Sequence, residues 1–138
     1  MDQFAQYGLA IASVVIYAVI AQILNAATGI RKGAVDLAPG GSHGADYGDP
    51  AYRLDRTYMN TIEMLVFYAA IVFAAILAGA SPLWINLLAT AGMILRVAAN
   101  VVYLRGIGAP YGGLRTRIII AASLCNLAMA VLAFVAVF

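Results

Sequence analysis

The chain has 138 residues, of which 64% are hydrophobic and only 10% charged, and its formal net charge is +2. Soluble domains are roughly 45–50% apolar and about 25% charged, so this composition excludes an ordinary globular protein. The net charge is also too small and too local to indicate nucleic-acid binding.

Four apolar runs account for the hydrophobic excess, at residues 6–27, 57–80, 82–104 and 117–138. Each is long enough to cross a hydrocarbon core of about 30 Å as a helix. The first run is not preceded by Lys or Arg and is longer than the apolar part of a secretory signal, so we expect it to be a true span. The sequence predicts one domain over residues 1–138, an all-α membrane protein with four helices running up and down.

The connections between these runs differ in length and charge. The second is nearly absent, because Gly79, Ser81 and Pro82 turn the chain at once, and this predicts a tight antiparallel hairpin. Seven of the eight basic residues lie in or beside the first and third connections. The positive-inside rule therefore predicts that loops 31–55 and 105–115 are cytoplasmic and both termini outside, in the inner membrane if the source is bacterial.

The first connection, 31–55, is rich in Gly and Pro and shows no periodicity. Long loops of this kind are usually functional or disordered. His43 has no second metal ligand near it, so we expect a solvated residue and no metal site. Cys125 stands alone in the fourth run and is interpreted as a packing residue. Tyr7 and Trp84 lie near the outer boundary and are interpreted as interfacial anchors.

A polar stripe opens the second run. Arg56, Asn60 and Glu63 are spaced i, i+4 and i+7, which places them within about 60° of one another on a helix. The third run carries Arg96 and, seven residues later, Tyr103. Ionisable groups inside a membrane nearly always face protein or a cavity and pair with something. We therefore expect Glu63 and Arg96 to pair, either to pin the helices together or as part of a site.

Further basic and aromatic residues surround this stripe at the predicted cytoplasmic rim. Pinning of helices by polar side chains explains such a group less well than ligand binding does. The planar fork of arginine grips carboxylates at two points, so the rim predicts an acidic ligand. The rim residues are Arg31, Arg53, Arg56, Tyr58, Tyr103 and Arg115.

The pattern Arg56-x-x-x-Asn60-x-x-Glu63 resembles the signature of the MAPEG superfamily, the membrane-associated proteins of eicosanoid and glutathione metabolism. The likeness covers nearly the whole chain, including the span count and the long first loop. Met64 and Ala99 depart from it, since many enzymatic members have tyrosine there. Other positions that fit are Arg31, Arg53, Arg96 with Tyr103, and Leu114-Arg115.

This resemblance implies a homotrimer in membrane lipid that uses glutathione as co-substrate and needs no metal. Glutathione would lie between adjacent subunits, and Arg115, with Arg117 as the fallback, would stabilise its thiolate as the catalytic residue. The implied function is a transferase or peroxidase acting on hydrophobic electrophiles or lipid hydroperoxides. The implied glutathione-binding residues are Arg31, Arg53, Arg56, Asn60, Glu63, Arg96 and Tyr103.

Two alternatives from other classes remain open. One is a non-catalytic lipid-binding or scaffold subunit of a membrane assembly, which the same trimer would serve. The other is a small proton-coupled exporter that uses Glu63. The arginines near Glu63 suit an anionic ligand better than a cationic drug, and the one-sided basic loops argue against an antiparallel dimer.

Overall fold

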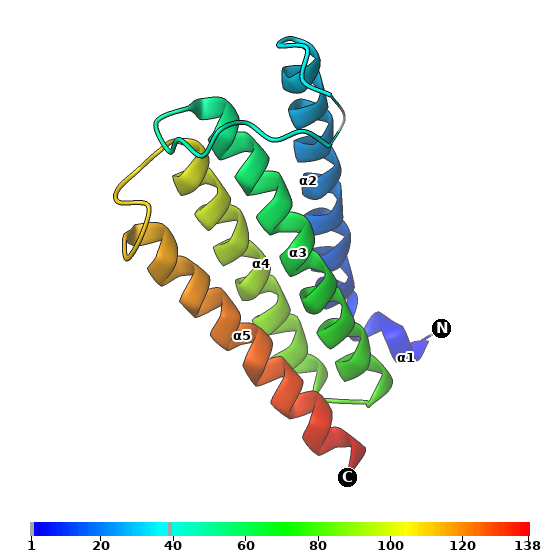
Figure 1. Cartoon of the computed structure of the whole chain (residues 1–138). Coiled ribbons are helices and arrows are strands. Elements are labelled where there is room, and N and C mark those ends of the chain that lie inside the picture. Colours follow the sequence, from blue (N-terminus) through cyan, green and yellow to red (C-terminus); the bar gives the residue numbers. More distant parts are fainter. Residues whose placement is uncertain (1, 39) are drawn as a thin grey trace.

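The computed structural model describes residues 2–38 and 40–138. All regular secondary structure within these residues is helix, and the helices are joined by turns and irregular connections. The four long helices alternate in direction, and both chain ends lie at the end of the bundle opposite the two longer connections (Figure 1). All four are long and apolar enough to cross a membrane. The predicted all-α, four-helix, up-and-down bundle is thus confirmed for the single chain. The helices are α1 (Asp2–Ala5), α2 (Gly8–Gly33), α3 (Pro50–Leu77), α4 (Pro82–Leu104) and α5 (Leu114–Val137).

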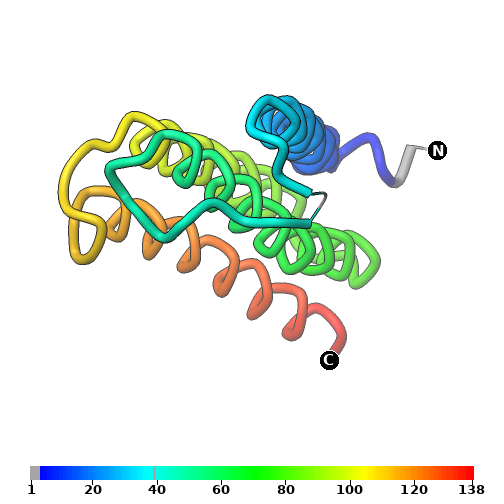
Figure 2. The backbone as a smooth tube through the Cα atoms, turned by 45° about the horizontal axis from the view of Figure 1, so that its top comes forward, coloured from blue at the N-terminus to red at the C-terminus, as the bar shows by residue number. Residues whose placement is uncertain are grey.

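Helices α3 and α4 form the middle of the bundle. Helix α2 packs on both of them, and so does α5. In Figure 2, α2 and α5 lie on opposite sides of this central pair. Aromatic side chains fill the interior: Tyr17 meets Tyr68 edge to face at 5.9 Å, and the Tyr68 hydroxyl donates to the Ala89 carbonyl at 2.9 Å. Because side chains close the middle of the bundle, room for a polar site is left at its ends.

Helix α3 begins well before the predicted start at residue 57. The Asp49 side chain accepts a hydrogen bond from the Ala51 N–H at 2.8 Å, and Pro50 takes the first helical position, where no N–H is needed. Helix α2 likewise runs to Gly33 rather than residue 27, and α5 begins at Leu114 rather than residue 117. These helices therefore continue past the apolar runs into polar sequence, and a side-chain cap, Asp49, marks the start of α3. Helix α4 has the predicted bounds.

The predicted hairpin between α3 and α4 is confirmed. Gly79 has a φ of 71°, a left-handed conformation that glycine adopts without strain. The Tyr7 hydroxyl donates to the Ala80 carbonyl in this turn, and the Tyr7 side chain is buried. Tyr7 thus fastens the start of α2 to the hairpin, and its interpretation as an interfacial anchor was wrong. Trp84 is half exposed, and its role as an interfacial anchor stays a prediction.

Candidate functional site

A polar pocket lies at the loop end of the bundle, where the starts of α3 and α5 meet the end of α4 and both long connections. Its volume is about 320 Å³. Its lining contains two arginines and four tyrosines, and none of the described residues that line it is acidic. We call it the tyrosine–arginine pocket. The residues are Ala45, Tyr47, Tyr52, Arg56, Tyr103, Pro110, Tyr111 and Arg115.

The position of Arg115 is set by Tyr103. The Arg115 guanidinium carbon lies 4.3 Å from the centroid of the buried Tyr103 ring, a cation–π contact. Tyr47, in the first connection, packs its ring against Tyr103, with the two centroids 5.4 Å apart. A guanidinium that stacks through its face keeps its N–H donors in the plane of the group, where they can bind an anion. The contact with Tyr103 holds the Arg115 guanidinium at the pocket wall.

Arg53 fastens the first connection to the end of α4. Its Nε donates to the Leu104 carbonyl at 3.2 Å, and its Nη1 donates to the carbonyls of Tyr47 and Gly48 at 2.7 and 3.0 Å. Gly106 allows the approach, since a Cβ there would lie 3.2 Å from the guanidinium carbon. Three of its contacts go to backbone carbonyls, and Arg53 does not line the tyrosine–arginine pocket. It positions Tyr47 rather than contacting that pocket.

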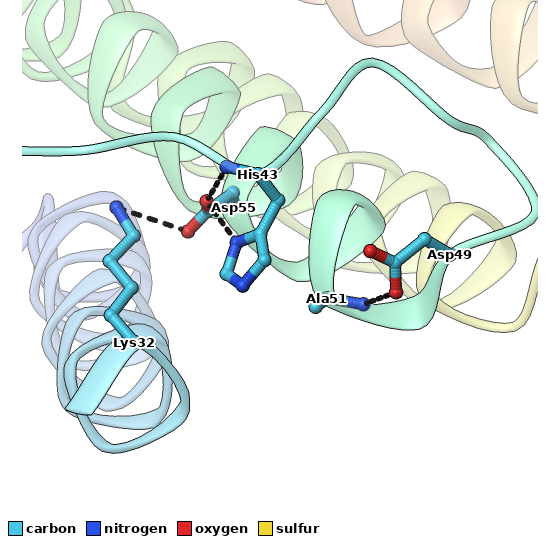
Figure 3. A network of polar contacts seen from close by, with 5 residues as sticks. All are labelled: Lys32, His43, Asp49, Ala51 and Asp55. Carbon is cyan, nitrogen blue, oxygen red and sulfur yellow. Dashed lines mark hydrogen bonds and ion pairs between the residues drawn. The ribbon is translucent and has the colours of Figure 1, made fainter. Parts of the chain in front are cut away.

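A buried carboxylate fastens the same connection at a second point (Figure 3). The Asp55 Oδ2 atom lies 2.7 Å from Nδ1 of His43 and accepts a hydrogen bond from the His43 backbone N–H, and Oδ1 lies 3.3 Å from Nζ of Lys32. The Asp55 side chain is only 8% exposed and the His43 side chain 12%. The prediction that His43 is solvated was wrong, because a carboxylate buried in the second turn of α3 needs partners and the loop folds back to supply one.

The expected Glu63–Arg96 pair does not form. Arg96 is buried and its Nη2 donates to Ser123 Oγ of α5 at 3.1 Å. Glu63 is exposed on α3, and both ion pairs found within residues 2–38 and 40–138 involve Asp55. Spacing along one helix says which residues share a face, but not how that face is rotated toward a neighbour. The Arg96 side chain reaches from α4 to α5, whereas Glu63 lies on the exposed face of α3.

The structure brings together three of the predicted site residues, Arg56, Tyr103 and Arg115. Others lie elsewhere on the single chain. Arg31 is exposed beside an apolar groove at the end of α2, and Asn60 is half-buried on α3 outside the pocket lining. The pocket of one chain is therefore built from part of the predicted set, and the stripe residues Asn60 and Glu63 lie outside its lining.

The sequence comparisons agree with this architecture. A family model described as the MAPEG family matches residues 7–135, which is most of the chain. The chain belongs to the MAPEG family. A search among curated proteins gives no match. As a MAPEG protein with four membrane-crossing helices it is an integral, multi-pass membrane protein, and the family supports a role in glutathione or eicosanoid metabolism in general terms.

Sequence reasoning missed several residues of the MAPEG chain's pocket. Tyr52 stands four residues before Arg56 and therefore shares its face, so the stripe could have been extended backward to include it. Tyr47 and Tyr111 come from the two connections, where no periodicity indicates direction. Their positions depend on Arg53 and on the turns of the third connection, which are tertiary contacts.

Proposed function

We propose that this MAPEG protein is a membrane-embedded glutathione-dependent transferase or peroxidase acting on hydrophobic electrophiles or lipid hydroperoxides. One observation carries the proposal: Arg56 and Arg115 line a single pocket of tyrosines whose described lining contains no acidic side chain. Such a pocket attracts an anion, because two guanidinium groups have no carboxylate beside them to neutralise their charge. Glutathione supplies carboxylates for Arg56 and a thiol for Arg115.

The proposed chemistry follows from the charge of Arg115. A free thiol has a pKa of about 8.5, and a nearby fixed cation lowers it toward neutrality. The resulting thiolate is the nucleophile. In a transfer reaction its sulfur bonds to the electrophilic carbon as the leaving group departs. In a peroxidase reaction it attacks the terminal hydroperoxide oxygen, the O–O bond breaks, an alcohol leaves with a proton, and a second glutathione then forms the disulfide and releases water.

The exposed polar residues within the helices support an oligomer as the working form, and we propose that it is the homotrimer that the family resemblance implies. Glu63 is exposed on α3 of the single chain, and Gln22 is exposed on α2. A carboxylate facing lipid is costly, so a neighbouring copy is expected to cover Glu63. This arrangement brings Arg31, Asn60 and Glu63 to a subunit boundary. Native mass spectrometry of the detergent-purified protein is expected to show three copies, and a purely monomeric, folded protein would contradict this.

The first test is calorimetric titration of glutathione into the purified protein at neutral pH. We expect saturable binding that Arg56→Ala weakens about 10- to 100-fold, because a charge-assisted hydrogen bond contributes about 1.5–3 kcal/mol. Arg105→Ala is the matched control, since Arg105 is exposed near the same end and does not line the pocket. Equal losses in both variants would contradict a specific site. No binding to a folded wild-type protein would favour the non-catalytic lipid-binding alternative.

A further inference from the structure

A second and larger cavity lies between α2 and α3, beneath the first connection. Its volume is about 660 Å³, against about 320 Å³ for the tyrosine–arginine pocket. We call it the under-loop cavity. The side chains that line it include Asn25, Thr28, Lys32, Leu37, Tyr58 and Met59.

The charges around the under-loop cavity disfavour an anion. Its cation, Lys32, is already paired with Asp55 at 3.3 Å, and the described residues that line it include no arginine. Its other polar groups are the neutral side chains of Asn25, Thr28 and Tyr58, which lie beside the apolar Leu37 and Met59. A carboxylate would find no unpaired cation here, whereas an uncharged molecule with an oxygen atom would find several hydrogen-bonding groups.

Thr28 provides an independent sign of a ligand. It is only 4% exposed, and its buried Oγ1 has no hydrogen-bond partner among the described residues. The hydroxyls of Thr57 and Thr61 instead donate to the carbonyls four residues earlier, each at 2.7 Å. A buried, unpaired hydroxyl costs about 1–3 kcal/mol, and a ligand oxygen would recover that free energy once rotation of the Thr28 side chain turns its covered hydroxyl toward the cavity.

The under-loop cavity adjoins the tyrosine–arginine pocket through a third cavity of about 320 Å³. This connecting cavity shares Lys32 and Met59 with the under-loop cavity. It shares Tyr52 and Arg56 with the tyrosine–arginine pocket. A molecule held beneath the loop is therefore separated from Arg56 by this one connecting cavity.

We propose that the under-loop cavity binds an uncharged, lipid-soluble molecule with a hydrogen-bonding oxygen, and that this molecule is the second substrate. Its role as substrate rests on the function proposed above, but its binding does not. The two cavities divide the reactants by charge: the tyrosine–arginine pocket takes the anionic thiol compound, and the under-loop cavity takes the neutral partner. Arg56 lines both the tyrosine–arginine pocket and the connecting cavity that lies between the two.

The test fills the under-loop cavity and measures binding directly. A Cβ placed on Gly29, which lines the cavity, meets no other atom within 4 Å, so the side chain of Gly29→Leu starts in open space and is expected to reduce the room for a ligand. The probe is a medium-chain alcohol bearing a diazirine, and its light-dependent adducts are mapped by mass spectrometry. We expect adducts on the peptide containing Tyr58 and Met59, reduced at least several-fold in Gly29→Leu and also reduced in Thr28→Val.

The control is Gly8→Leu, at the other end of α2, where a Cβ also meets nothing within 4 Å. It should label like the wild type. The proposal is overturned if wild type gives no adducts on that peptide, if Gly29→Leu labels normally while remaining folded, or if the matched diazirine fatty acid labels the cavity as strongly as the alcohol does.

Kinetics separates this proposal from the proposed function. With cumene hydroperoxide as substrate, Gly29→Leu is expected to raise the KM for the hydroperoxide several-fold and leave the calorimetric affinity for glutathione unchanged. Labelling that persists in a protein that does not bind glutathione would overturn the proposed function and keep the neutral-ligand site. Normal glutathione binding without labelling would overturn the neutral-ligand site and keep the proposed function.

Discussion

Replacement of Arg115 by alanine is expected to lower the kcat of glutathione conjugation about 100-fold or more. The loss follows from removing a fixed cation beside the reacting sulfur, since a single preorganised charge-stabilising donor typically contributes 10²–10³ in rate. Arg115 is well placed for this because its guanidinium stacks 4.3 Å from the centroid of the Tyr103 ring in the tyrosine–arginine pocket. Initial rates with a chlorodinitrobenzene electrophile at neutral pH give the measurement.

Arg117→Ala is the matched control for Arg115→Ala. Arg117 lies two residues further along α5, is exposed and does not line the pocket, so its removal should leave kcat close to wild type. Bound glutathione should show thiolate absorbance at neutral pH in wild type and in Arg117→Ala, but only at higher pH in Arg115→Ala. Arg115→Lys should recover part of the rate. Similar rates for the two alanine variants would rule out a catalytic role for Arg115.

Replacement of Asp55 by alanine is expected to release the first connection and to destabilise the protein by about 3 kcal/mol, the size typical of breaking a buried ion pair from one side. The Asp55 carboxylate is 8% exposed and joins Lys32 of α2 to His43 of the loop. Without it, two buried polar groups lose their partner. The measurements are the apparent melting temperature in detergent and the amide hydrogen exchange of residues 34–49.

Two further variants test this prediction, one with an intermediate expected effect and one as a control. Asp55→Asn keeps a hydrogen-bonding oxygen for His43 and loses only the charge, so its effect should be intermediate. Asp46→Ala is the control, because Asp46 is exposed in the same loop and its side chain accepts a local bond from the Gly48 N–H. The proposed anchor is wrong if Asp55→Ala leaves the hydrogen exchange of the loop as slow as in wild type.

The number, order and direction of the helices could be predicted because lipid allows few other solutions for apolar runs of this length. The helix ends were less predictable from hydropathy, although the Asp49–Pro50 pair is a readable start signal in retrospect. Part of the pocket could also be predicted, since Arg56, Tyr103 and Arg115 all lie near the loop ends of their helices.

The remaining contacts depend on how helices rotate against one another and on how loops fold back. The expected Glu63–Arg96 pair failed for the first reason, as Arg96 turns toward Ser123. The contact of His43 with Asp55 escaped prediction for the second, because a loop without periodicity gives no sign of where it returns. Both contacts are set by tertiary packing, which a single sequence does not display.

The first connection is held at two points, by the His43–Asp55 contact and by the hydrogen bonds of Arg53, and this has an evolutionary consequence. His43 and Arg53 fix the part that carries Tyr47, whereas Leu37 and Gly40, in the stretch between the anchors at Lys32 and His43, line the under-loop cavity. Extra residues in that earlier stretch add little closure entropy, since its cost grows only with the logarithm of loop length. Related sequences are therefore able to vary its length and reshape the cover of one cavity without moving the wall of the other. Specificity for a neutral substrate can diverge while the arginine-lined half is inherited unchanged.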